Sequence, residues 1–121
     1  MEKPRIRKWL IDVRIAVAKV EKFLAGRRFD QLPPDEDMVQ AAVEREIEII
    51  GEAINRILDA EPDIEITSAR QFVNVRNIVI HRYDEIDDQI IARMIRVNLP
   101  ILKTEIEALL TTKYYDDDLA D

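Results

Sequence analysis

The sequence contains no cysteine, only one histidine and one tryptophan, and two glycines in 121 residues. Without cysteine the chain has no disulfide, no thiol nucleophile and no cysteine-ligated zinc or iron–sulfur site. This absence fits a reducing compartment, so we expect a cytoplasmic protein. Little glycine together with abundant Ile, Leu, Val, Glu and Arg is typical of an all-α protein.

Long uninterrupted apolar segments are also absent. Residues 6–24 form the first apolar stretch, but Arg14, Lys19, Glu21 and Lys22 interrupt it. It therefore reads as an amphipathic helix, and we expect neither a signal peptide nor a membrane span. The length predicts one domain, which we place at residues 1–112. Residues 113–121 include three consecutive aspartates and are expected to form a disordered acidic tail.

The charge is unevenly distributed. The net charge of −7 argues against a general nucleic-acid binder, because affinity for phosphates depends on Lys and Arg. Residues 1–28, however, carry nine Lys or Arg and three Asp or Glu, whereas residues 29–121 carry nine and 22, a balance of −13. The basic first segment is either a track for phosphates or an ordinary solvated helix surface, and the sequence leaves both open.

Apolar spacing and the positions of proline and glycine predict four helices. They cover about residues 4–25, 35–60, 69–83 and 90–110, in an up-and-down-type four-helix bundle whose last helix kinks at Pro100. The expected buried faces include Trp9, Met38, Ile78 and Ile90, one in each helix.

Gly51 lies in the middle of the second predicted helix. A mid-helix glycine costs about 1 kcal/mol relative to alanine. We therefore expect Gly51 to permit the close approach of another helix, such as the one that carries His81. Glu52 beside it either orients Arg76 or faces solvent.

The only histidine lies in a short polar motif within the third predicted helix. A helix advances about 100° per residue, so Asn77 and His81 lie about 40° apart and Arg76 and Tyr83 about 20° apart. All four then share one polar edge. Histidine transfers protons near neutral pH, and a guanidinium stabilises the added negative charge of a pentacoordinate phosphate. The edge therefore indicates acid–base chemistry on a phosphodiester, although a histidine near a helix end can also serve as a C-terminal cap.

The pattern Arg-x4-His-x-Tyr, with Asn directly after Arg, resembles the signature of the HEPN superfamily, and its tyrosine points to the HepT-like branch. Two other segments agree with this resemblance. Residues 50–53 are similar to the family's Ile-Gly-Glu-Ala, and residues 98–100 are similar to its Asn-Leu-Pro. The resemblance covers about residues 4–112.

The resemblance implies a HEPN-like helical homodimer that acts as a metal-independent endoribonuclease toxin in a toxin–antitoxin module. Arg76 and His81 would be the catalytic pair, with Asn77 in support. Tyr83 would be adenylylated by a cognate nucleotidyltransferase (MntA-like) antitoxin. RNA is the implied substrate, and neither a metal nor a cofactor is implied.

The chemistry of RNA cleavage also favours a dimer. Attack by the 2′-hydroxyl needs a base to take its proton and an acid to protonate the leaving 5′ oxygen, and each chain has a single histidine. Two protomers would bring two copies of His81 to one groove. The alternative is a non-catalytic helical partner that binds a nucleotidyltransferase and presents a nucleotide to it, with Arg76 and His81 as phosphate contacts.

Overall fold

The computed structural model describes residues 2–80 and 88–116, and every regular element within these residues is helical. The three longest helices before the gap are α1 (Glu2–Leu24), α2 (Asp37–Ala60) and α3 (Ala69–Ile80). A short 3-10 turn, η1 (Phe29–Gln31), lies between the first two. After the gap, α4 (Asp88–Arg93), a π-helical turn η2 (Met94–Asn98) and α5 (Leu99–Thr111) follow one another without a break.

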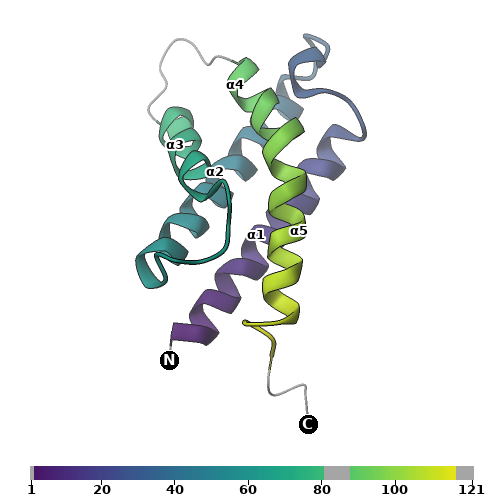
Figure 1. Ribbon diagram of the computed structural model, residues 1–121. Helices are drawn as coiled ribbons and strands as arrows, with labels where there is room; N and C mark the ends of the chain where they lie inside the picture. Colours follow the sequence, from purple (N-terminus) through teal and green to yellow (C-terminus); the bar gives the residue numbers. More distant parts are fainter. Residues whose placement is uncertain (1, 81–87, 117–121) are drawn as a thin grey trace.

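The helices run alternately up and down (Figure 1). α1 and α2 form an antiparallel pair; α3 packs mainly on α2, and α5 packs mainly on α1. Counting α4, η2 and α5 as one interrupted helix, this arrangement confirms the predicted all-α bundle with four principal helices. None of the helices in the described residues is long and apolar enough to cross a membrane.

One core runs through the bundle, and all four helices contribute to it. Its largest fully buried side chains include Leu10 of α1, Ile50 of α2, Phe72 of α3 and Ile106 of α5. Trp9 packs against this core but is only partly buried.

Three of the expected core residues lie outside the core. Met38 is 84% exposed, Ile78 39% and Ile90 41%, so their assignment to the buried faces is wrong. Each occupies the first or last turn of its helix. Helical periodicity gives the direction of a side chain, but a terminal turn can extend beyond the neighbouring helix that would bury it.

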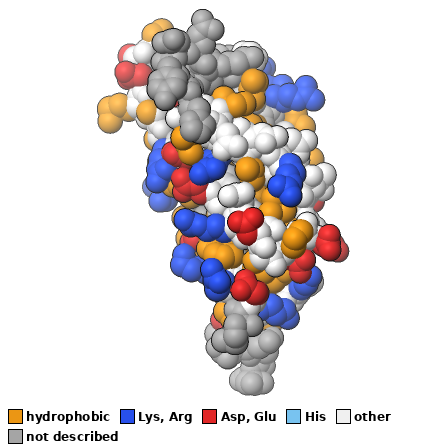
Figure 2. All heavy atoms as spheres, turned by 90° about the vertical axis from the view of Figure 1, so that its left-hand side faces the viewer, with side chains coloured by type: hydrophobic (Ala, Val, Ile, Leu, Met, Phe, Trp, Pro, Cys, Tyr) orange, Lys and Arg blue, Asp and Glu red, His pale blue; other side chains and the backbone are white. Residues whose placement is uncertain are grey.

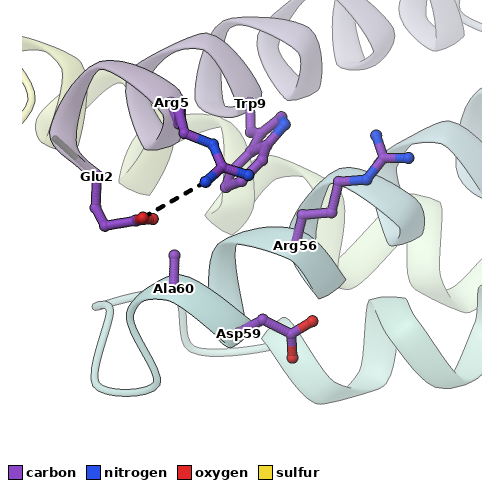
Figure 3. A pocket seen from close by; sticks show the side chains of 6 residues that line it. All are labelled: Glu2, Arg5, Trp9, Arg56, Asp59 and Ala60. Atoms are coloured by element: carbon purple, nitrogen blue, oxygen red, sulfur yellow. Dashed lines mark hydrogen bonds and ion pairs between the residues drawn. The ribbon is translucent and has the colours of Figure 1, made fainter.

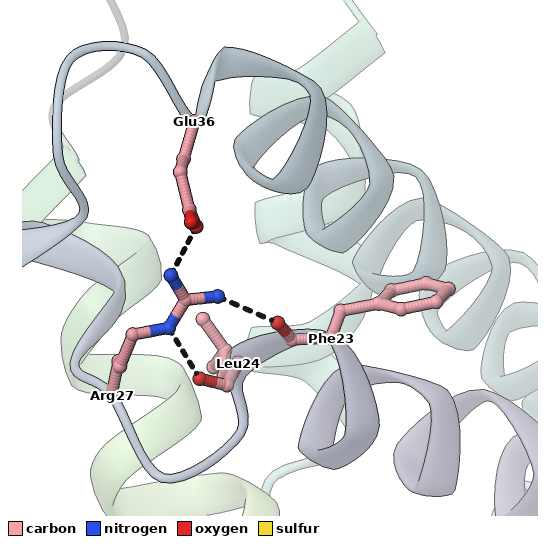
Figure 4. Close-up of polar contacts among 4 residues, drawn as sticks. All are labelled: Phe23, Leu24, Arg27 and Glu36. Atoms are coloured by element: carbon pink, nitrogen blue, oxygen red, sulfur yellow. Dashed lines mark hydrogen bonds and ion pairs between the residues drawn. The ribbon is translucent and has the colours of Figure 1, made fainter.

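The connection between α1 and α2 is held by Arg27. Its guanidinium donates to the carbonyl oxygens of Phe23 (3.1 Å) and Leu24 (2.8 Å) and forms an ion pair with Glu36 (Figure 4). The final carbonyls of a helix have no partner within the helix, so this side chain caps α1. Because Glu36 directly precedes α2, the same contact joins the end of one helix to the start of the next.

The last helix is interrupted before Pro100. Proline has no N–H for the usual bond to the carbonyl four residues earlier. The chain accommodates this loss with the π-helical turn η2, where the N–H of Leu99 bonds to the carbonyl of Met94, five residues earlier. The predicted interruption is thus present as a wide turn upstream of the proline. Beyond α5, Tyr114 is 2% exposed, so a residue assigned to the tail is part of the core.

Gly51 is the point of closest approach between α2 and α3. A Cβ placed on Gly51 would lie 2.3 Å from Cβ of Arg76 and 2.8 Å from the carbonyl oxygen of Phe72. Both atoms belong to, or sit next to, the backbone of α3, so neither can move aside without moving the helix. The expectation that this glycine admits the motif helix is confirmed.

We predict that Gly51→Ala destabilises the protein by about 1–3 kcal/mol, because the added methyl group overpacks the contact with α3. Helix propensity alone predicts the opposite, a gain of about 1 kcal/mol. The sign of the change in the free energy of unfolding, measured by urea denaturation, therefore separates the two effects. Ala41→Gly, an exposed position in the same helix, is the control and should lose about 1 kcal/mol by propensity alone. A stabilised Gly51→Ala protein would contradict the close packing.

Candidate active site on helix α3

Arg76 and Asn77 lie together on α3 with different degrees of exposure. Arg76 is half-buried, because its first side-chain carbons lie against Gly51, whereas Asn77 is exposed. Nη1 of Arg76 donates a hydrogen bond of 3.0 Å to Oδ1 of Asn77. The amide therefore orients the guanidinium, and its own NH2 group remains on a surface that a ligand can reach.

One donor of the Arg76 guanidinium lacks an acceptor within the described residues. Nε of Arg76 is buried and has no hydrogen-bond partner among the residues that the structure describes. A buried donor without an acceptor costs about 1–3 kcal/mol. A phosphate oxygen next to the guanidinium would interact with its positive charge, since charge-assisted bonds to phosphate are among the stronger hydrogen bonds in proteins.

His81 and Tyr83 lie outside the described residues, as does Arg82. Helix α3 is described to Ile80, so the predicted polar edge is described only at Arg76 and Asn77. These two are neighbours in the sequence, and the hydrogen bond between them joins their side chains. Whether His81 and Tyr83 share that edge stays a prediction.

Two further polar residues continue the line of Asn77 toward the start of α3. Asn74 and Arg70 precede Asn77 by three and seven residues, a spacing that puts side chains on one side of a helix. Both are exposed. Neither is among the residues singled out from the sequence, although the same helical spacing applied upstream of Asn77 points to both. Arg70 adds a cation that could contact a phosphate of a strand lying along this side.

The start of α3 is fixed by α5 and η2. Nδ2 of Asn98 donates to Oγ of Ser68 (2.8 Å), and the carboxylate of Glu105 accepts from N of Thr67 (3.1 Å) and from its hydroxyl (2.6 Å). Thr and Ser often cap the start of a helix, but the hydroxyls of Thr67 and Ser68 form hydrogen bonds with residues of α5 and η2. Asn98 begins the Asn-Leu-Pro segment, so that segment positions the motif helix.

Other charged groups near the motif face elsewhere. Glu52 lines a cleft between α1 and α2 with Lys19 and Arg56, so it lies away from Arg76.

The basic first helix forms ion pairs along its own surface. On α1, Arg5 pairs with Glu2 and Lys8 with Asp12. On the side of the molecule seen in Figure 2, Lys and Arg side chains alternate with Asp and Glu, and no uniformly basic track is visible among the described residues.

Comparisons with known proteins identify the family of the chain. The family model described as "Ribonuclease HepT-like" matches residues 13–109, most of the chain. The chain belongs to the HepT-like ribonuclease family. The matched range includes Gly51, Arg76, Asn77 and the Asn98 segment.

A relative supports the same assignment. The chain is 29% identical over 108 residues to the Methanocaldococcus jannaschii protein named "Putative RNase MJ1380". The aligned region covers 88% of this chain and 98% of the relative. No solved structure matches the chain. Because ribonucleases act on RNA, membership of the HepT-like family indicates an RNA substrate.

Proposed function

We propose that this protein is a metal-independent endoribonuclease whose catalytic residues are Arg76 and His81, supported by Asn77. One observation carries the proposal: the first side-chain carbons of Arg76 pack against Gly51 and its guanidinium is bonded to Asn77, five residues before the histidine of the family motif. Family membership provides the reaction class.

The proposed reaction is an internal transesterification. A base removes the proton of the ribose 2′-hydroxyl, whose oxygen then bonds to the adjacent phosphorus. The P–O5′ bond breaks, and an acid protonates the departing 5′ oxygen. The products are a 2′,3′-cyclic phosphate and a free 5′-hydroxyl. His81 of each protomer supplies one proton transfer, and Arg76 stabilises the charge on the pentacoordinate phosphate.

The second protomer has a candidate surface on which to pack. Ile90, Val97 and Ile101 line one side of the α4–η2–α5 helix and are 41%, 41% and 44% exposed. Ile78 and Ile80, at the end of α3, are similarly exposed. Isoleucine and valine gathered on one side of a helix favour burial against another chain, and a two-fold interface uses the same surface on both copies. A dimer formed here would lie beside the end of the motif helix.

The regulatory part of the proposal concerns Tyr83. A nucleotidyltransferase antitoxin would join the Tyr83 oxygen to the α-phosphorus of ATP, with release of the phenolic proton and pyrophosphate. The attached AMP would bring a bulky anion to the polar edge, where it would pair with Arg76 and compete with RNA. The enzyme would then be a toxin that its antitoxin silences without unfolding it.

We predict that Arg76→Ala and His81→Ala each reduce RNA cleavage by at least about a hundredfold, because each removes a group that acts on the transition state. Cleavage of total RNA by purified protein in the presence of a chelator measures this. Arg45→Ala is the matched control, since that arginine is exposed and pairs with Glu48 on α2. Undiminished cleavage by both motif variants would refute the assignment.

The dimer is tested by sedimentation. The protein should have twice the chain mass of 14.1 kDa, and Val97→Glu should yield a folded monomer that no longer cleaves RNA, because a buried, unpaired carboxylate opposes association. Ile15→Glu places the same charge at a position 49% exposed on α1 and should leave the dimer intact. An active monomer would contradict the composite site.

Tyr83→Phe tests the regulation. The variant keeps the ring, so we expect normal cleavage and growth inhibition but no neutralisation by a cognate nucleotidyltransferase supplied with ATP. Mass spectrometry of the unaltered protein should show an added AMP. If the Phe variant is neutralised as well as the parent and the parent gains no mass, the tyrosine is not the modification site.

A further inference from the structure

A cleft of about 660 Å³ opens between the start of α1 and the end of α2 (Figure 3). Glu2, Arg5 and Trp9 line it from α1, and Arg56 and Asp59 line it from α2, with Ala60. None of these residues belongs to the motif on α3.

The cleft lies on a different side of α2 from the motif helix. Gly51 faces α3, and Arg56 follows it by five residues, a rotation of about 140° around the helix axis. Asp59 is a further turn along, about 12 Å from Gly51 measured along the axis. A ligand in this cleft would therefore occupy a site separate from Arg76.

Trp9, the only tryptophan of the chain, forms one wall. It packs against the core but remains partly exposed, and the guanidinium carbon of Arg5 lies 5.1 Å from its ring centroid. A guanidinium over an indole is a favourable cation–π contact, and both flat groups can stack on a nucleobase. The wall thus provides a stacking surface in an open cleft.

The charged residues of the cleft complement the other parts of a nucleotide. Arg56 is exposed and has no ion pair within the described residues, so its guanidinium is available to a phosphate. Glu2 and Asp59 are exposed carboxylates, which accept hydrogen bonds from base amino groups or ribose hydroxyls. The Glu2–Arg5 pair, at 3.5 Å on the surface, is weak enough to rearrange.

We propose that this cleft is a nucleotide-binding site. The base stacks on Arg5 and Trp9, the phosphate binds Arg56, and Asp59 or Glu2 accepts from the base or the ribose. The volume is within the range of about 300–1,000 Å³ typical of small-molecule sites. A free mononucleotide and one nucleotide of single-stranded RNA present the same chemistry. The proposal goes beyond the cleavage reaction and does not depend on it.

The single tryptophan makes binding measurable, because the indole that lines this cleft is the only one in the chain. The full-length protein is titrated with AMP, with inorganic phosphate, and with an RNA oligonucleotide carrying 2′-O-methyl groups, which cannot be cleaved by 2′-hydroxyl attack. We expect saturable quenching by AMP, by the oligonucleotide or by both, and a dissociation constant about tenfold weaker in Arg56→Ala. A response to AMP identifies the free nucleotide as a ligand, and a response to the oligonucleotide alone identifies RNA.

Lys22→Ala is the matched control, an exposed cation on α1 outside the cleft whose loss should leave the quenching unchanged. Arg56→Lys, which keeps the charge, should bind more tightly than Arg56→Ala. Absence of quenching by AMP and by the oligonucleotide overturns the proposal, as does quenching that Arg56→Ala leaves unchanged or that inorganic phosphate alone reproduces. Because the methylated oligonucleotide cannot be cleaved, these outcomes are independent of whether the protein is a ribonuclease.

Discussion

The contact between Gly51 and Arg76 is the constraint on which the rest of the site depends. The two helices approach so closely there that a single methyl group on α2 would overlap Cβ of Arg76. This packing leaves Arg76 half-buried, and Asn77 accepts a hydrogen bond from its guanidinium. A side chain that would otherwise sample many rotamers is thereby restricted, and restriction before binding favours the positioning of a phosphate.

The segments that resemble the family's motifs are far apart in the sequence but converge on this one helix. Gly51 fixes the middle of α3, and Asn98 reaches Ser68 just before its first turn. Asn98 can do so because it ends the π-helical turn that precedes Pro100. Pro100 and Asn98 therefore act together. Pro100 requires the interruption of the helix at η2, and Asn98, at the end of that turn, bonds to Ser68 and so holds the start of α3.

The sequence predicts the structure correctly where the local chain determines it, as at helix ends. It is wrong where burial depends on a neighbouring helix. Helix boundaries followed from Pro and Gly, and Gly51 was correctly interpreted because glycine weakens the middle of a helix unless close packing requires it there. The prediction that Met38, Ile78 and Ile90 are buried was wrong, because periodicity cannot tell whether a partner helix extends as far as a terminal turn. Trp9 was assigned to the core by its spacing, yet it also lines a cleft, since the ends of α1 and α2 leave that part of the bundle open.

An acidic protein that acts on RNA cannot depend on general attraction to phosphates. Its net charge is −7, and surface pairs such as Arg14 with Glu107 and Lys103 with Glu21 neutralise cations that could otherwise track a nucleic-acid backbone. In the proposed site, affinity would come from a few guanidinium groups whose positions the fold determines. Arg76 is held by helix packing, and Arg70 lies on the same helix nearly two turns earlier. Replacing Arg76 or Arg70 by lysine would therefore remove the planar arrangement of donors, even though it preserves the charge.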